Sequence, residues 1–252
     1  MILTPGFEAI DATRVATTFT TTRDGGVSKG PYATLNVSYS VGDERRSVDA
    51  NRALIAARLR VTADRLVSAR QKHGISVWQV DLSDLTPRDA DILVTTTPSI
   101  ALMTYTADCT PIVLLDPNKR VAATVHAGRR GVQQHAAIIA VTYMVERLGC
   151  ALSSILAGLG PSIAREHYEI DEPTIGSLQS TLYDIEQFLR PTRPGHAVFD
   201  LVGANVAQLS AAGLNPDNII VSGHDTFSQP EHYFSARRQQ PFGCMGTGIM
   251  LL

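Results

Sequence analysis

The chain of 252 residues lacks the features of several protein classes. Aromatic residues make up only 6% of it and its Arg-Arg pairs are scattered, so neither a base-stacking platform nor a basic stripe for nucleic acid is present. Three cysteines (Cys109, Cys150 and Cys244) at wide spacing do not form a disulfide framework. No apolar run reaches the roughly 20 residues that cross a bilayer. We therefore expect no nucleic-acid partner and no membrane partner.

The same absences favour a reducing compartment. The N-terminal residues do not show a basic segment followed by an apolar one, so no signal peptide is predicted and a cytoplasmic location is expected. What the chain does have is apolar residues, 44% of the total, and a net charge of only −2. This composition can bury a sizeable core, and we expect one domain over residues 1–252, with a monomer favoured.

Apolar periodicity predicts alternating strands and helices. Strands are predicted at 15–22, 67–69, 75–80, 91–95, 100–106, 112–115, 121–125, 155–159, 219–221 and 248–252. Helices are predicted at 47–59 with Ser47 as N-cap, along one stretch from Val132 to Leu148, at 173–182, and at 201–211 between Asp200 and Gly213. The turn at 116–119 predicts a hairpin between the strands beside it. This order is typical of a mixed α/β fold with helices covering sheets.

Three short motifs carry residues that bind metals. They are Gln71-Lys72-His73-Gly74, Thr106-Ala107-Asp108-Cys109-Thr110-Pro111 and His126-Ala127-Gly128-Arg129-Arg130-Gly131. Two imidazoles and one thiolate suit zinc, and a set of three ligands leaves the fourth tetrahedral position open, as in catalytic sites. The sequence thus makes His73, Cys109 and His126 a candidate zinc site.

Spacing alone supports this site weakly, because it differs from the tight patterns that identify zinc sites by sequence. A lone cysteine is more often a small core residue, and a lone histidine is more often a satisfied loop residue. The local context favours function here. Cys109 follows an apolar strand, and His126 ends a strand before a glycine-containing turn into a helix.

Two segments are candidates for binding an anion. The turn after His126 leads into a helix, whose free N–H groups attract phosphate, and Arg130 is placed to add a bidentate contact. The loop from Arg23 to Ser28 contains Gly25-Gly26, which lets the backbone approach a ligand. Asn36 is a polar residue in strand-like surroundings. Ordinary turns with solvated arginines are the alternative for both segments.

Taken together, the motifs resemble one family along nearly the whole chain. It is the YfiH-type family, described as multicopper polyphenol oxidases or laccase-domain proteins. The matching segments are residues 22–28, 30–32, 35–36, 41–43, 51–52, 71–74, 90–91, 106–111, 126–128, 160–161, 168–169, 200–201, 234–235 and 237–238.

The resemblance implies a four-layer α/β/β/α fold with mixed sheets. It implies a zinc site whose ligands fall on His73, Cys109 and His126, which would also be catalytic. It implies phosphorolysis of adenosine, inosine, guanosine or methylthioadenosine with phosphate, and deamination of adenosine. Some bacterial members are linked instead to the editing of cell-wall peptide precursors.

The remaining candidate residues would act on the proton and on the substrate. Asp108 is the candidate acid/base because it is next to Cys109. Arg23, Asn36 and Arg130 are the candidates for binding substrate or phosphate. The laccase description conflicts with composition, because a multicopper oxidase needs a trinuclear cluster in addition to a blue-copper centre, and seven histidines are too few. Copper at the His73, Cys109 and His126 site remains an alternative to zinc.

The chain departs from the family pattern at three positions. Arg129 stands where the family has tryptophan, Asp225 where it has cysteine, and Cys244 where it has arginine. These departures change the predicted pocket wall and leave the preferred nucleoside open. They motivate a second possibility, a member that binds nucleosides without turnover. A third possibility is a cysteine hydrolase with Cys109 as nucleophile, activated by His73 or His126.

Overall fold

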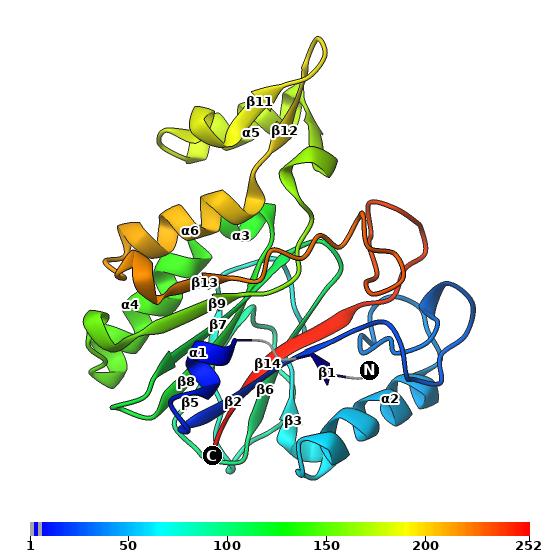
Figure 1. The fold of residues 1–252 in the computed structure, drawn as a ribbon, viewed down its shortest axis with the longest axis vertical. Helices are drawn as coiled ribbons and strands as arrows, with labels where there is room; N and C mark the ends of the chain where they lie inside the picture. Colours follow the sequence, from blue (N-terminus) through cyan, green and yellow to red (C-terminus); the bar gives the residue numbers. More distant parts are fainter. Residues whose placement is uncertain (1–2, 5–6) are drawn as a thin grey trace.

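Two β-sheets face each other in the computed structural model, which describes residues 3–4 and 7–252 (Figure 1). The five-stranded sheet has the order β1-β2-β14-β6-β3, and the six-stranded sheet has the order β13-β9-β7-β8-β5-β4. The strands of the first sheet are β1 (Leu3–Thr4), β2 (Ala16–Thr21), β14 (Met245–Leu251), β6 (Ala101–Thr106) and β3 (Leu66–Val67). Those of the second are β13 (Ile219–Val221), β9 (Leu156–Leu159), β7 (Thr110–Asp116), β8 (Val121–Ala127), β5 (Ile92–Thr95) and β4 (Val77–Gln79).

Helices cover the outer face of each sheet. The helices are α1 (Glu8–Asp11), α2 (Arg45–Arg58), α3 (Arg129–Gln133), α4 (Ala136–Leu148), α5 (Glu172–Thr181) and α6 (Leu201–Ala211). Short 3-10 helices lie at Gly30–Tyr32, Ala63–Arg65, Leu152–Ser154, Arg165–His167, Ile185–Phe188 and Pro216–Asn218. Helix α2 packs on the five-stranded sheet through Ile55, Ala56 and Phe19. Helices α4 and α6 pack on the six-stranded sheet through Val141, Met144 and Leu209.

Apolar side chains fill the space between the two sheets. Val113 and Leu115 of β7 meet Ile249 and Leu251 of β14 in one cluster. A second cluster joins Leu93 of β5 with Leu102 of β6 and with Trp78. The inner and outer faces of both sheets are therefore buried, and the four layers run α/β/β/α as predicted.

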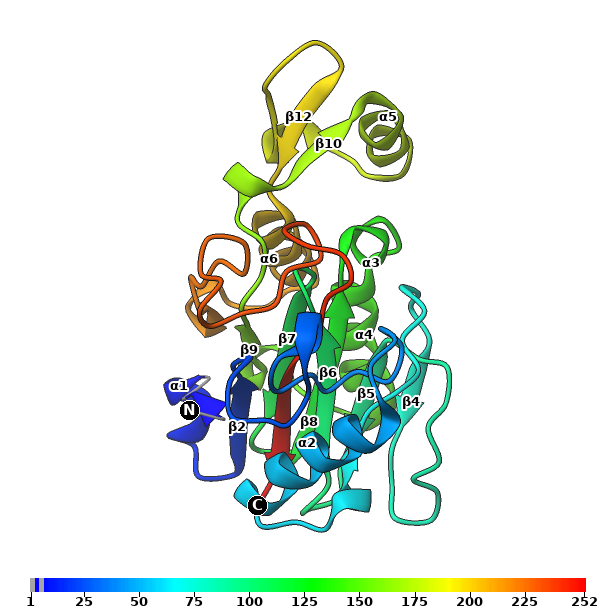
Figure 2. The ribbon, with the colours of Figure 1, turned by 90° about the vertical axis from the view of Figure 1, so that its right-hand side faces the viewer.

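A small third sheet stands at one end of the molecule. Its strands are β10 (Glu169–Asp171), β12 (His196–Phe199) and β11 (Leu189–Pro191), in that order, and α5 packs beside them. Figures 1 and 2 show this unit above α3 and α6, away from the main sandwich. The segment 165–200 thus adds a projecting wall to one end of the four-layer core.

The predicted helix at 201–211 agrees with the structure at both ends. The Asp200 carboxylate accepts a hydrogen bond from the main-chain N–H of Gly203, which caps α6. Gly213 follows the helix with a φ of +97°, a conformation that favours glycine. The hairpin is also confirmed, since β7 pairs antiparallel with β8 and the Asp116 carboxylate accepts from the N–H groups of Asn118 and Lys119.

Two other helix predictions are wrong in detail. Ser47 is not the N-cap, because α2 begins at Arg45 and its N-cap is Glu44. The single helix predicted from Val132 to Leu148 is two helices, α3 and α4. His135 separates them with a left-handed backbone, at φ 61°, and no sequence signal of helix termination marks that position. In the described part of the chain, no helix is both long enough and apolar enough to cross a membrane.

The chain crosses from one sheet to the other at two places that matter for function. Strand β3 belongs to the five-stranded sheet and β4 to the six-stranded one, and the segment between them carries His73. Strand β6 likewise leads across to β7 through Asp108 and Cys109. The side chain of Gln71 ties the two crossovers together, because its amide bonds both the N–H and the C=O of Tyr105 on β6.

Candidate functional site

The side chains of His73, Cys109 and His126 converge although the sequence separates them widely. One potential ligand atom of each lies within 4.8 Å of the others. The two imidazole rings meet edge to face with their centroids 4.7 Å apart. His126 is buried, Cys109 is half-buried and His73 is exposed. The group therefore has one buried side and one side open to solvent.

Asp91 holds two of these residues in place. Its Oδ1 lies 2.8 Å from Nδ1 of His126, and its carboxylate also accepts from the main-chain N–H groups of Lys72, His73 and Gly74. A carboxylate that is ionised only accepts, so Nδ1 of His126 carries a proton and Nε2 is the nitrogen that would bind a metal. This is the arrangement in which a carboxylate fixes the tautomer and orientation of a metal-binding histidine.

Gly128 makes room for the thiol of Cys109. A Cβ placed at Gly128 would lie 2.5 Å from Sγ of Cys109 and 3.9 Å from Nε2 of His126. Its φ of −76° is one that any residue adopts, so the requirement for glycine is steric. The turn after His126 is thus shaped around the sulfur.

Two residues of the site have left-handed backbones without being glycine. They are His73 at φ 59° and Asp108 at φ 88°. Such conformations cost free energy and persist where surrounding contacts hold them. Asp91 holds His73 through its N–H group, and Ile163 holds Asp108 by donating to its carbonyl.

The charges of the three side chains support one another. Burial raises the pKa of the Cys109 thiol, but the neighbouring His126 and His73 outweigh burial and lower this pKa to about 6. Burial works in the opposite direction on His126, whose pKa is raised by the Cys109 thiolate and by Asp91. The ground state without metal is therefore a thiolate beside an imidazolium.

This donor set fits a metal ion. Two imidazole nitrogens and a thiolate are ligands for zinc, and the exposed side at His73 leaves room for a fourth ligand. Among the described residues, no other group of three or more His, Cys, Asp or Glu side chains converges in this way. The histidines thus do not assemble a second metal cluster in the described part of the chain.

Asp108 lies next to Cys109, but its carboxylate points to the loops that cover the site. Oδ1 accepts from the Thr226 hydroxyl at 2.6 Å, and Oδ2 accepts from the main-chain N–H of Arg237 at 2.7 Å. The side chain is buried. Both oxygens are therefore occupied in anchoring Thr226 and Arg237 next to Cys109.

The polar residues predicted to bind substrate have other partners. The Arg23 guanidinium donates to the carbonyls of Ala33 and Pro230 and lies over the Phe234 ring. Asn36 is buried; its amide donates to Ser38 and Asp43 and accepts from the N–H groups of Ser38 and Cys244. Arg130 is exposed on α3. The structure does not bring Asn36 or Arg23 into contact with the three converging side chains.

The positions that depart from the family pattern are integrated into the structure. Asp225 bonds Nδ1 of His167 at 2.7 Å and accepts from the N–H groups of Ala164, Phe227 and Ser228. It thereby fixes the segment that leads to Tyr168. Cys244 is buried and donates its N–H to Asn36, and burial raises its pKa to about 12. Arg129 bonds Gln133 one helical turn along.

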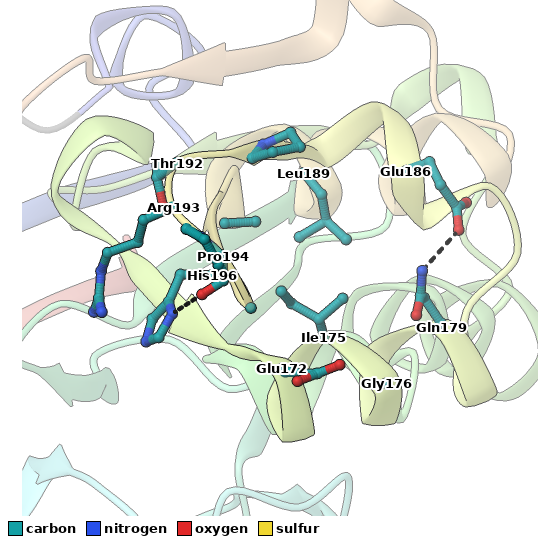
Figure 3. A pocket seen from close by; sticks show the side chains of 13 residues that line it. Glu172, Ile175, Gly176, Gln179, Glu186, Leu189, Thr192, Arg193, Pro194 and His196 are labelled. Carbon is teal, nitrogen blue, oxygen red and sulfur yellow. Dashed lines mark hydrogen bonds between the residues drawn. The ribbon is translucent and has the colours of Figure 1, made fainter.

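Two cavities lie around the projecting unit. One of about 910 Å³ opens between α5 and the β11–β12 hairpin, where Ile175 and Leu189 face each other with Glu172 and Glu186 at the rim (Figure 3). The other, of about 390 Å³, shares Arg193 and His196 with the first and is also lined by Arg129, Tyr168 and Arg237. Only the second borders the residues that flank His126 and Cys109.

Asp91 and Gln71 hold the segments of the candidate site together, and the sequence did not predict this for either residue, although both lie in recognised motifs. Their partners are distant in the sequence: 17 to 35 residues away for Asp91 and 33 or 34 for Gln71. An aspartate directly before a buried strand was the available signal for Asp91. Gln71 gave none beyond its neighbour His73.

Comparison with known proteins identifies the family of the chain. Residues 17–252 match the family described as multi-copper polyphenol oxidoreductase laccase. A purine nucleoside phosphorylase of Streptomyces coelicolor is 42% identical over 242 residues, which are 92% of this chain and 93% of that protein. An adenosine deaminase of an unknown prokaryotic organism is 34% identical over 230 residues, 87% of each chain.

A solved structure shows the same fold. The crystal structure of the hypothetical protein YfiH of Bacillus licheniformis superposes with a TM-score of 0.93 at 27% identity, covering 99% of this chain and 97% of that one. Fold, motif order and family match agree along the chain. This protein therefore belongs to the YfiH-type family, the one that carries the laccase description.

Proposed function

We propose that this protein is a zinc-dependent purine nucleoside phosphorylase that also deaminates adenosine. The observation that carries the proposal is the convergence of His73, Cys109 and His126 within 4.8 Å on a surface open to solvent. The names of the relatives support it, because they include a purine nucleoside phosphorylase and an adenosine deaminase. Adenosine, inosine, guanosine and methylthioadenosine are the proposed substrates.

His73, Cys109 and His126 are the residues that would hold the zinc ion. When bound, zinc supplies a Lewis acid and lowers the pKa of a bound water to near neutrality. The protein supplies the ligand geometry. Asp91 keeps the proton of His126 on Nδ1, and the left-handed turn at His73 directs its ring toward the same point.

Phosphorolysis sets a clear requirement for the rest of the site. An oxygen of phosphate forms a bond to C1′ of the ribose while the bond from C1′ to the purine nitrogen breaks. The purine leaves with the electron pair and takes up a proton, and ribose 1-phosphate remains. The site must therefore hold an anion beside C1′ and stabilise negative charge on the leaving base.

Asp108 is the predicted acid/base, but its contacts favour a structural role over proton transfer. With Oδ1 bonded to Thr226 and Oδ2 to the N–H of Arg237, the carboxylate has no oxygen directed at a substrate. We infer that Asp108 is a positioning residue that holds the covering loops. Its substitution should then act on stability as well as on rate.

The direct test is kinetic. The zinc-loaded protein is supplied with adenosine, with and without phosphate, and adenine, ribose 1-phosphate and inosine are followed. Adenine and ribose 1-phosphate that depend on phosphate support phosphorolysis, whereas inosine in either condition supports deamination. Absence of all three products from adenosine, with no free base released from inosine, guanosine or methylthioadenosine, would contradict the proposal.

A cysteine hydrolase is the second candidate, because one observation favours it. Cys109, His126 and Asp91 have the order of a nucleophile, a base and an orienting carboxylate, and the pKa of Cys109 is lowered to about 6. Metal binding and nucleophilic attack compete for the same thiolate. Rapid alkylation of Cys109 by iodoacetamide in the metal-replete protein would favour the hydrolase.

A further inference from the structure

A polar cavity of about 390 Å³ lies between the main sandwich and the projecting unit. Three arginines contribute to its wall: Arg129 from α3, Arg193 from the β11–β12 hairpin and Arg237 from the loop before β14. Tyr168 and Thr174 add hydroxyl groups. The wall thus gathers cations from three segments that are far apart in the sequence.

The cavity adjoins the metal-binding group along two chain connections. Arg129 directly follows Gly128, the residue that packs on Sγ of Cys109. On the other side, the N–H of Arg237 donates to Asp108, the neighbour of Cys109. Tyr168 belongs to the same wall: burial and the charge of Cys109 raise the pKa of its hydroxyl, and the charges of Arg129 and Arg237 lower it.

The carboxylates in the wall are already occupied. Glu169 accepts from Arg193 through both oxygens and also accepts from the Thr192 hydroxyl. Asp171 caps α5 by accepting from the N–H of Thr174. The positive charge of Arg193 is therefore balanced, and neither carboxylate is left to balance the other two arginines.

Arg129 and Arg237 have only neutral partners among the described residues. Arg129 donates to the amide oxygen of Gln133. Arg237 donates to the carbonyl of Glu169, and its guanidinium lies 5.1 Å from the centre of the Tyr168 ring. Two guanidinium groups of uncompensated charge thus flank one phenol, and each retains N–H groups for a further acceptor.

We propose that Arg129, Arg237 and Tyr168 form a site for a phosphoryl group. Guanidinium groups recognise the oxygens of such a dianion in a bidentate manner. The group has two possible sources: inorganic phosphate bound next to a nucleoside, or the 5′-phosphate of a nucleotide. The inference rests on the proposed function for its nucleoside, but binding of the anion is measurable without turnover.

The other cavity around the projecting unit does not suit an anion. Figure 3 shows Glu172 at its rim and Ile175 and Leu189 toward its centre, and Glu186 bonds Gln179 at the far end. Its lining also includes Arg193 and His196. Arg193 is already paired with Glu169, so a dianion there would meet two carboxylates and no unpaired guanidinium, whereas Arg129 and Arg237 have no carboxylate partner.

The experiment measures binding of inorganic phosphate and of adenosine 5′-monophosphate to the metal-loaded protein by isothermal titration calorimetry at constant ionic strength. The variants are Arg129→Gln and Arg237→Gln. Arg237→Gln keeps the main-chain N–H that bonds Asp108. A change in anion binding in this variant would therefore report loss of the guanidinium and not loss of the bond to Asp108. Arg147→Gln is the matched control, since Arg147 is an exposed arginine on α4 outside the cavity wall.

Each glutamine variant should weaken binding of the anion by about 10-fold or more, as expected for loss of a hydrogen bond between charged groups. The control should bind as the unchanged protein does. Arg129→Lys and Arg237→Lys should recover part of the affinity, because they keep the charge. Unchanged binding in both glutamine variants, or loss only in Arg130→Gln, overturns the proposal. So does a wild-type protein that binds neither probe at 10 mM, a concentration roughly tenfold above a dissociation constant of about 1 mM.

Kinetics distinguish the source of the phosphoryl group. If it is inorganic phosphate, the variants raise the KM for phosphate in phosphorolysis and leave the KM for adenosine nearly unchanged. If it is a 5′-phosphate, adenosine 5′-monophosphate binds more tightly than adenosine, and the variants remove that difference. Turnover of adenosine that depends equally on phosphate in all variants, together with adenosine 5′-monophosphate that binds no more tightly than adenosine, would leave the proposed function standing and sink this inference.

Discussion

The Asp91 carboxylate and the His126 imidazole are bonded at 2.8 Å, Oδ1 to Nδ1, and both side chains are buried. Asp91 uses its remaining capacity to accept from three consecutive N–H groups, those of residues 72–74. One carboxylate therefore sets the tautomer of one ligand and the backbone of another. Two of the three candidate metal ligands therefore depend on the same carboxylate.

Asp91→Asn should weaken metal binding by about 10- to 100-fold, the range typical of residues that orient a metal-binding histidine. In the asparagine variant one acceptor oxygen becomes an NH₂ donor. This donor would face either a main-chain N–H group or the protonated Nδ1 of His126, and neither can accept a hydrogen bond. A competition titration against a chromophoric chelator measures the change. Asp89→Asn is the matched control, because Asp89 is exposed and bonds Arg70 instead. Equal affinities in the two variants would refute the role given to Asp91.

Gly128→Ala should reduce zinc content and lower the free energy of unfolding by about 1–3 kcal/mol, as overpacking does. The new Cβ would lie 2.5 Å from Sγ of Cys109, so the thiol must move away from the two imidazoles. Elemental analysis and urea denaturation measure both effects. Gly176→Ala is the control, since a Cβ there meets nothing within 4 Å. Full zinc occupancy in Gly128→Ala would show that the thiol tolerates displacement.

Alkylation of the metal-free protein should be selective for Cys109 and should be half-maximal near pH 6. Below that pH the thiol is protonated and unreactive, and above it the thiolate reacts. Burial, the larger cause in each case, raises the pKa of Cys150 and Cys244 to about 12, so both should stay unlabelled at neutral pH. Iodoacetamide labelling followed by mass spectrometry gives the profile. A midpoint near the ordinary thiol value of about 8.5 contradicts the influence of His126.

Asp108→Asn should lower the free energy of unfolding by about 1–3 kcal/mol, because an amide leaves one of two buried donors without its acceptor. Urea denaturation with and without zinc measures this loss. The alternative role as acid/base has a different signature. Unchanged stability together with loss of one limb of the pH–rate profile would restore the acid/base assignment and exclude a purely positioning one.

Local signals predicted most elements of the fold. Helix α6 was located to the residue because Asp200 and Gly213 mark its ends, and β13 was predicted at the observed residues 219–221. The break at His135 escaped prediction, since left-handed backbone at a non-glycine residue depends on tertiary contacts. The division of strands between two sheets was implied by the family resemblance, not by periodicity.

The sequence predicted the three candidate metal ligands, but it did not predict the residues that surround them. His73, Cys109 and His126 stand in distinctive motifs, so they were found before their distances were known. Arg129 was noticed only as a departure from the family pattern. That Arg129 and Arg237 line the same cavity cannot be predicted from the sequence. The two residues lie on α3 and on a loop more than 100 positions later, so only the folded chain brings them together. Arg23, Asn36, Arg130 and the extent of a single domain over 1–252 remain predictions.

The two crossovers between the sheets have a consequence for the order of folding. His73 and Cys109 sit on separate crossovers, and His126 ends a strand of the six-stranded sheet, so the ligands meet only after both sheets have docked. A partly folded chain has no complete ligand set to offer, since such sites rarely preexist in unfolded chains. An ion bound by the three side chains would join both crossovers to the six-stranded sheet. Binding of the proposed metal would therefore report that the two sheets have docked.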